Sequence, residues 1–159
     1  MGKAANSSIS LKQIHVTDNF WNKYVHLVKD VIIPYQWDIL NDKLEDVETS
    51  HCIENFKIAA GEKEGEFQGA VFQDTDVAKW LEAVGFVLNY ERDEKLEELA
   101  DETIELIGRA QQPDGYLNTY FTIKEPDGRW SNLMEGHELY TAGHMIEAAV
   151  AYYEATGKR

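Results

Sequence analysis

The sequence predicts an all-α protein whose helical hairpins form about half of an α/α toroid. Apolar residues recur at helical spacing in most segments. Helices that are apolar on nearly every side alternate with helices that have one charged face, as a two-layered ring of helix pairs requires. A closed ring needs about a dozen helices, whereas 159 residues hold about six. We therefore expect residues 9–159 to form the half-ring, after a disordered lead-in at residues 1–8.

Capping and proline signals divide the first part of the chain. Asp18 is a good N-cap for a helix whose apolar spacing continues to Pro34. Proline has no amide hydrogen, so Pro34 should kink or restart the helix. A third helix, residues 51–61, ends in Gly61, which suits a C-cap. In residues 62–74 apolar and polar residues alternate too irregularly for a strand, and glycines interrupt the segment, so a loop is predicted there.

Three longer helices follow, and they differ in their apolar faces. Residues 75–90 are apolar on nearly every side, which predicts a buried helix. Residues 95–110 have one apolar stripe and one acidic face, which predicts a surface helix. The last helix, from about His137 to Ala155, is expected to be buried or nearly so. One face of it is an apolar stripe, which contains Leu139, Ala142, Ile146, Ala149, Val150 and Tyr153. The opposite face is made of small residues and a histidine, namely His144, Ala148 and Ala151.

Charge and composition exclude several classes of partner. The chain has 29 acidic and 15 basic residues, a net charge of −14, which repels phosphate backbones and anionic lipid. We therefore expect no nucleic-acid or membrane partner. No signal-peptide or membrane-spanning segment is evident, so we expect a cytoplasmic protein. The single cysteine, Cys52, is expected to be a small buried residue.

The stretch "GHELYTAGH" raises the question of a metal site. His137 and His144 are seven residues apart, so a helix separates them by about 10 Å along its axis. The helical zinc motif needs histidines at i and i+4, and this spacing does not match it. We expect no metal site from this helix. His137 lies near a helix N-terminus, where a neutral imidazole could bind a sugar hydroxyl, while His144 is expected to be structural.

Two further segments contain candidate binding residues. Asp74 and Asp76 precede the buried helix, and one of them is expected to be its N-cap. With Gln73 and Trp80 nearby, the pair also resembles a carbohydrate subsite. The turn at Pro113-Asp114-Gly115 leads into a long polar and aromatic loop, in which Tyr116 and Tyr120 are candidate ligand contacts.

Several long blocks, in order, resemble one known family. They are "IPYQWDILND", "FKIAAGE", "GAVFQDTDVAKWLE", "RAQQPDGYLNT" and "GHELYTAGHMIEAAVAYYEATG". From about Ile9 to Arg159 the chain is similar to the N-terminal part of the β-L-arabinofuranosidases of glycoside hydrolase family 127. The resemblance implies an (α/α)6 barrel, followed in full-length members by β-sandwich domains. It also implies removal of terminal β-L-arabinofuranose by a retaining mechanism.

The resemblance assigns binding residues but no catalytic ones. It places a substrate-contacting histidine at His137, and it places Phe72, Gln73, Asp74 and Asp76 near the sugar cavity. The family's zinc-bound cysteine nucleophile, its glutamate acid/base and its other zinc ligands belong to motifs that this sequence lacks. Cys52 lies outside the family's cysteine motif. We therefore expect the 159-residue chain to be inactive and metal-free, with zinc bound only by a full-length parent.

The sequence is also compatible with other functions. Half a ring exposes helices built to be buried, and large exposed apolar patches mark association surfaces. The chain could then be a helical protein-interaction or small-molecule-binding module, or a homo-oligomer formed through the exposed half-barrel surface. A third alternative is a metal-binding helical protein, which would contain zinc when purified.

Overall fold

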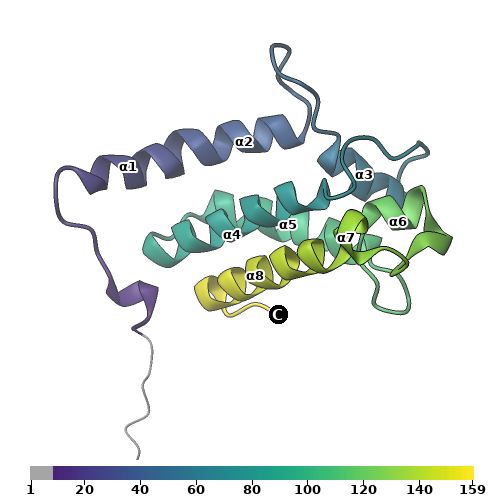
Figure 1. The fold of residues 1–159 in the computed structure, drawn as a ribbon. Helices are drawn as coiled ribbons and strands as arrows, with labels where there is room; N and C mark the ends of the chain where they lie inside the picture. Colours follow the sequence, from purple (N-terminus) through teal and green to yellow (C-terminus); the bar gives the residue numbers. More distant parts are fainter. Residues whose placement is uncertain (1–8) are drawn as a thin grey trace, which may run out of the picture.

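The computed structural model describes residues 9–159, and over that range it contains helices but no strand (Figure 1). The all-α prediction is confirmed; the lead-in expected at residues 1–8 lies outside the described residues. Among residues 9–159, no helix has both the length and the apolar character that a membrane crossing requires. The α-helices are α1 (Trp21–Leu27), α2 (Ile33–Leu40), α3 (Cys52–Ala59), α4 (Asp74–Tyr90), α5 (Glu94–Ala110), α6 (Thr119–Ile123), α7 (Leu133–Gly136) and α8 (Glu138–Thr156). Two short 3-10 helices, η1 (Leu11–Gln13) and η3 (Pro126–Gly128), and one π-helix, η2 (Val28–Ile32), complete the set.

The helices α1, η2 and α2 form one long helical rod (Figure 1). As predicted, Asp18 caps it: Oδ1 accepts the amide hydrogens of Phe20 at 3.0 Å and Trp21 at 2.7 Å. Pro34 lies in the first turn of α2, directly after the π-helix η2. The wider π turn accommodates the missing amide hydrogen, so the helix changes its winding here without breaking.

The segment between α3 and α4 is a loop, as predicted. α3 is followed by Gly61 in the left-handed conformation (φ 73°), and the Gly61 amide donates to the carbonyl of Ile58 at 3.0 Å. Asn55, only 1% exposed, holds the loop to α3. Its Nδ2 donates to the carbonyl of Gln68 at 2.8 Å, and its Oδ1 accepts the Gln68 amide at 3.2 Å. Because the donor and the acceptor of this buried side-chain amide both bond to the loop backbone, Asn55 fixes the loop although the loop forms no strand.

α4 is the central helix of the fold and packs against α2, α3, α5 and α8. Val77 and Val84 are fully buried, so the predicted burial of this helix is confirmed. Trp80 is 2% exposed, its Nε1 donates to the carbonyl of Ile33 at 3.1 Å, and its ring packs on Trp37. Trp80 is therefore a core residue and not the exposed sugar platform that the sequence suggested.

α4 and α8 lie side by side and run in the same direction (Figure 1). Lys79 meets Tyr140 near their N-terminal ends, and Gly85 meets Ala151 further along. A Cβ atom on Gly85 would lie 2.8 Å from the Ala151 carbonyl carbon and 2.9 Å from the Tyr152 nitrogen. The two backbones approach this closely only because Gly85 has no side chain.

The contact between α4 and α8 also corrects an expectation about α8. Its small face is buried, with Ala148 3% and Ala151 4% exposed, whereas its apolar stripe is not covered by the described residues. A small face lets two helices approach more closely than a face of large side chains, so the small face is the one that packs on α4. The exposed members of the stripe are Leu139 (61%), Ile146 (64%), Val150 (50%) and Tyr153 (44%).

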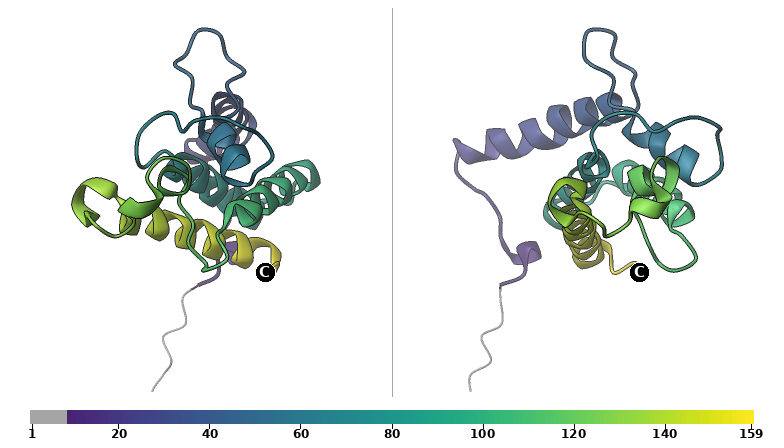
Figure 2. Two further views of the ribbon diagram at one scale, coloured as in Figure 1. Left: turned by 90° about the vertical axis from the view of Figure 1, so that its right-hand side faces the viewer. Right: turned by 45° about the vertical axis from the view of Figure 1, so that its right-hand side comes forward.

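α5 lies beside α4 (Figure 2). Its buried residues include Ala100 and Leu106 of the apolar stripe, while Glu98, Glu102 and Glu105 of its acidic face are exposed, as predicted. Asp93 caps it by accepting the amide hydrogen of Leu96 at 3.1 Å. The hydroxyl of Tyr152 donates to Asp101 Oδ1 at 2.6 Å, which ties α8 to α5. A buried helix therefore alternates with a surface helix, which is the pairing that an α/α ring repeats.

The connection between α5 and α8 is more structured than the long loop that the sequence predicted. The turn at residues 113–115 is confirmed, with Gly115 at φ 87° and its amide donating to the Gln112 carbonyl at 2.8 Å. Beyond it, α6, η3 and α7 follow in close succession. Asn118 caps α6 by accepting the amide hydrogen of Phe121 at 3.1 Å, a local signal that explains the extra helical turn.

Candidate functional site

The N-terminal ends of α4 and α8 bring three rings together. Phe72 lies two residues before α4, His137 is the N-cap of α8, and Tyr140 lies in the first turn of α8. The ring centroids of Phe72 and His137 are 5.1 Å apart, those of His137 and Tyr140 are 6.0 Å apart, and those of Phe72 and Tyr140 are 6.4 Å apart. Phe72 is 39% and Tyr140 45% exposed. We call these three residues the aromatic cluster; it forms an accessible surface of ring faces and edges.

His137 is held in an uncommon backbone conformation between α7 and α8. Its φ of 52° lies in the left-handed region, which few residues other than glycine adopt. Its Nδ1 lies 2.8 Å from the carbonyl oxygen of Glu135. Because a carbonyl only accepts, Nδ1 carries the hydrogen of this bond, and Nε2 is the ring nitrogen left to a ligand. The structure thus fixes the orientation of the imidazole beside Phe72.

Gln73 directly follows Phe72 of the aromatic cluster in the chain, and it bonds to Asp76 in the first turn of α4. Gln73 Nε2 donates to Asp76 Oδ2 at 3.0 Å, and Gln73 Oε1 accepts the Ala70 amide at 3.1 Å. Gly69, at φ 96°, makes room for this arrangement, since a Cβ there would lie 2.7 Å from Gln73 Oε1. Partial burial raises the pKa of the Asp76 carboxyl, and the ammonium of Lys79 opposes that rise. Gln73 Nε2 also donates to Ser50 Oγ at 3.4 Å, so Gln73 holds the Asp76 carboxylate in place, and a carboxylate is a group that binds vicinal hydroxyls.

Sequence reasoning missed two residues of this site, Lys79 and Tyr140. Lys79 Nζ donates to the Tyr140 hydroxyl at 3.0 Å and to Thr75 Oγ1 at 3.3 Å. Each residue stands three positions after a predicted one, Lys79 after Asp76 and Tyr140 after His137. That spacing places them on the same helical face as the predicted residues, and it is the signal that could have identified them.

Asp74 has a different position from Asp76, although both were predicted as sugar contacts. It is 2% exposed, and its Oδ2 accepts the amide hydrogen of Thr119 at 2.7 Å while its Oδ1 accepts the Thr119 hydroxyl. Burial raises the pKa of the Asp74 carboxyl to about 6, although the two bonds from Thr119 lower it. Both oxygens are therefore used inside the protein, and the geometry makes Asp74 a positioning residue that joins α4 to α6.

Tyr116 also lies inside this supporting layer. Its hydroxyl donates to Glu138 Oε1, and Glu138 Oε2 accepts the Trp130 amide hydrogen at 2.7 Å. Glu138 is only 3% exposed, and burial together with this carboxylate raises the pKa of the Tyr116 hydroxyl. The guanidinium of Arg129 lies 4.1 Å from the Tyr116 ring centroid. Tyr116 thus contacts Glu138, the first residue of α8, and Arg129 and Trp130 in the segment before it; none of these residues belongs to the aromatic cluster.

The residues of this chain do not fit the zinc–cysteine centre that the family resemblance implies for a full-length protein. Cys52 is the single cysteine of the sequence and is fully buried. Its Sγ donates to the carbonyl of Gln73 at 3.3 Å, and burial, with Asp74 adding to it, raises the pKa of the thiol well above its usual value. A buried, protonated thiol is neither a nucleophile nor a zinc ligand.

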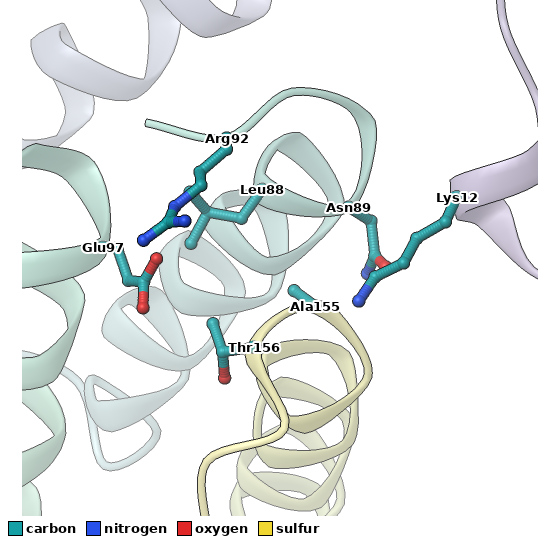
Figure 3. Close-up of a pocket in the computed structure, with 7 residues that line it drawn as sticks. All are labelled: Lys12, Leu88, Asn89, Arg92, Glu97, Ala155 and Thr156. Atoms are coloured by element: carbon teal, nitrogen blue, oxygen red, sulfur yellow. The ribbon is translucent and has the colours of Figure 1, made fainter. Parts of the chain in front are cut away.

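A cavity of about 440 Å³ lies at the opposite ends of α4 and α8 (Figure 3). It contains none of the residues predicted from the sequence. Its cations, Lys12 and Arg92, lie near helix C-termini, where positive charge offsets the helix dipole, so their presence has a structural explanation. The cavity is lined by Lys12, Leu88, Asn89, Arg92, Glu97, Ala155 and Thr156.

Known proteins resemble the chain in both sequence and fold. The model of the β-L-arabinofuranosidase GH127 catalytic domain matches residues 13–159. The non-reducing end β-L-arabinofuranosidase of Bifidobacterium longum subsp. longum is 42% identical over 160 aligned residues, which cover 91% of this chain and 24% of that protein.

Solved structures give the same result. The crystal structure of a GH127 β-L-arabinofuranosidase from Geobacillus stearothermophilus T6 matches with a TM-score of 0.90 and 66% identity, covering 91% of this chain and 23% of that one. A second GH127 β-arabinofuranosidase matches with a TM-score of 0.84 and 35% identity, covering 95% and 24%. The chain thus spans about a quarter of the length of these relatives, and its predicted half-toroid fold is confirmed. It belongs to the β-L-arabinofuranosidases of glycoside hydrolase family 127 and carries part of their catalytic domain.

Proposed function

We propose that this chain supplies substrate contacts to a retaining glycoside hydrolase that removes terminal β-L-arabinofuranose. One observation carries the proposal: the aromatic cluster lies beside Gln73 and Asp76 at the adjoining ends of two helices. Exposed ring faces suit the C–H face of a sugar, while amide, carboxylate and imidazole groups suit its hydroxyls. The β-L-arabinofuranosidases that the chain resembles support arabinofuranosides as the substrate class.

The residues of this chain bind and orient the sugar in this proposal. Phe72 and Tyr140 stack on the ring, His137 Nε2 accepts a hydroxyl hydrogen, and Gln73 with Asp76 binds hydroxyls at the rim. Retaining hydrolysis needs two groups about 5 Å apart on either side of the anomeric carbon. Asp74 is enclosed, and Cys52 is a buried thiol, so neither supplies that pair. The proposal therefore places the nucleophile, the acid/base and the catalytic zinc ligands outside this sequence.

The cytoplasmic location expected from the sequence stays a prediction.

Sugar binding without turnover is the expected behaviour of the chain. Methyl β-L-arabinofuranoside, titrated by NMR, is expected to bind weakly, with Kd of roughly 1 mM or above, and to shift the His137 ring resonances. Phe72→Ala should weaken binding about tenfold, because it removes a stacking surface worth about 1.4 kcal/mol. His137→Ala should weaken it at least as much, since a hydroxyl loses its partner.

Phe86→Ala is the matched control for the binding experiment. Phe86 lies on α4, is 47% exposed and stands outside the aromatic cluster, so its removal should leave binding unchanged. An aryl β-L-arabinofuranoside incubated with the chain and zinc should release no aryl alcohol. Zinc-dependent turnover would refute the proposed lack of catalytic groups, and equal binding by all three variants would refute the site.

The uncovered stripe of α8 supports a proposal about partners. Ile146 is 64% and Val150 50% exposed, on the same helix face as Leu139 and Tyr153. We propose that two copies of the chain associate through this stripe. The chain should sediment as a dimer, Ile146→Lys should sediment as a monomer, and Glu98→Lys on the solvent face of α5 should remain dimeric. A wild-type monomer at all concentrations would contradict this proposal.

A further inference from the structure

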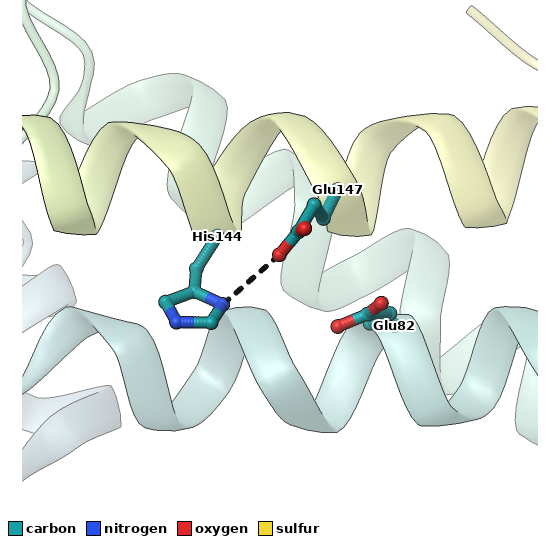
Figure 4. Close-up of side chains that lie close together, drawn as sticks. All are labelled: Glu82, His144 and Glu147. Atoms are coloured by element: carbon teal, nitrogen blue, oxygen red, sulfur yellow. Dashed lines mark ion pairs between the residues drawn. The ribbon is translucent and has the colours of Figure 1, made fainter.

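A second group of polar side chains lies further along α4 and α8, beyond the proposed sugar site (Figure 4). Glu82 projects from α4, and His144 and Glu147 project from consecutive turns of α8. One ligand atom from each residue lies within 4.8 Å of the other two. His144 Nδ1 lies 3.3 Å from Glu147 Oε2. Two helices thus bring one imidazole and two carboxylates to a common point.

We infer that Glu82, His144 and Glu147 form a binding site for a divalent transition-metal cation such as Zn²⁺, which joins α4 to α8. Imidazole nitrogen and carboxylate oxygen bind such ions at about 2.0–2.2 Å. Ligands at those distances stand about 3.0–3.5 Å from one another in tetrahedral or octahedral geometry. The separation of His144 from Glu147, 3.3 Å, already meets this condition, and a carboxylate oxygen of Glu82 lies within 4.8 Å of both ligand atoms.

The charges around the three residues favour a cation. Among residues 9–159, no lysine or arginine forms an ion pair with Glu82 or Glu147, in a chain whose net charge is −14. His144 Nδ1 is shielded from solvent. It lies 3.3 Å from Glu147 Oε2, but that contact is not a hydrogen bond, and no other group among the described residues forms one with this nitrogen. Buried polar nitrogens normally have a hydrogen-bond partner, so this atom calls for an explanation. A bound cation would satisfy the nitrogen and neutralise both carboxylates.

The imidazole is also held in place for such a role. The Tyr140 ring packs edge-on against it, with centroids 4.6 Å apart, and the His144 side chain is only 21% exposed. A simple His144–Glu147 ion pair accounts for two of the residues, but it leaves Glu82 without a counter-ion. The inference revises the sequence-based expectations that His144 is only structural and that the chain has no metal site. It does not rest on the proposed sugar site, with which it shares only the Tyr140 ring, or on the catalytic zinc of the family.

Calorimetric titration of the untagged, chelator-treated chain with zinc chloride tests the inference. The expected result is saturable binding with one ion per chain and a melting temperature that rises with zinc concentration. Glu82→Gln and His144→Gln should each lower the affinity by more than the roughly 10- to 100-fold that loss of an outer-sphere partner causes. Cd²⁺ in place of Zn²⁺ should give a ¹¹³Cd resonance coupled to the His144 ring.

Glu154→Gln is the matched control, because it removes one exposed carboxylate from the same helix and should bind zinc like the wild type. If His144→Gln fails to fold, Glu147→Gln tests the same site in its place, because the Glu147 side chain is 60% exposed and its replacement should not disturb folding. No saturable binding, or binding that survives both Glu82→Gln and Glu147→Gln, would overturn the inference. A zinc response that depends on His137 or His51 would likewise place the metal elsewhere.

Discussion

Replacing Asp74 by alanine is expected to destabilise the chain by about 3 kcal/mol at a pH of about 5.5. The variant leaves the Thr119 amide hydrogen and hydroxyl without the acceptor they have in the wild type, at a site where Asp74 and Thr119 are 2% and 1% exposed. A buried donor left without a partner costs about 1–3 kcal/mol, and the lost carboxyl also leaves a small void. Urea unfolding followed by tryptophan fluorescence measures the change.

The pH dependence of this loss has a defined sign. Burial raises the folded-state pKa of Asp74 from 3.8 to about 6, so the folded protein holds a proton that the unfolded chain releases. The stabilising contribution of the protonated carboxyl is complete below the unfolded pKa and is lost as the pH rises through about 6. The destabilisation by Asp74→Ala should therefore shrink by about 1 kcal/mol between pH values of about 5.5 and 7.5.

Asp74→Asn is the control for the carboxyl charge. Asparagine keeps an acceptor for Thr119 but carries no ionisable group, so it resembles the protonated aspartic acid. It should stay within about 1 kcal/mol of the wild type and gain relative to it as the pH rises. Parallel pH profiles for the wild type and Asp74→Asn, or a loss below about 1 kcal/mol for Asp74→Ala, would contradict the role of Asp74.

The difference between Asp74 and Asp76 shows where sequence reasoning ended at this site. Both residues follow the same capping pattern, which identified the start of the buried helix correctly. The prediction that one of them is its N-cap was wrong: Gln73 holds that position without a side-chain cap bond, and both aspartates lie in the first turn of α4. Their roles depend on Thr119, which is 45 residues away in sequence, and no local pattern contains that contact. Tyr116 was assigned to the sugar site for the same reason, because its partner Glu138 lies 22 residues further on.

The helices themselves were largely predictable, because their signals are local. The cap at Asp18, the change of helix winding at Pro34 and the burial of α4 all follow from residues within or next to one helix. The orientation of α8 does not follow from its own residues. That helix has an apolar stripe and a small-residue face, and either face could pack inward. The choice between them depends on Gly85, a residue of a different helix.

Gly85→Ala is expected to destabilise the chain by about 1–3 kcal/mol, the range for overpacking a close contact. The added methyl group would lie 2.8–2.9 Å from backbone atoms of Ala151 and Tyr152, which cannot rotate away as a side chain could. α4 and α8 would have to separate along their length. Urea unfolding measures the loss of stability, and NMR shifts of the Phe72 and His137 rings report the separation at the N-terminal ends.

Gly108→Ala provides the matched control, because Gly108 is also inside a helix but its added Cβ would meet no atom within 4 Å. Alanine there should stabilise the chain by about 0.5–1 kcal/mol through its higher helix propensity. Opposite signs for the same substitution would isolate the contact between α4 and α8 from helix propensity. Stabilisation by both variants would instead mean that the two helices separate at no cost. Gly85 would then not set the distance that brings Phe72 beside His137 and Glu82 beside His144.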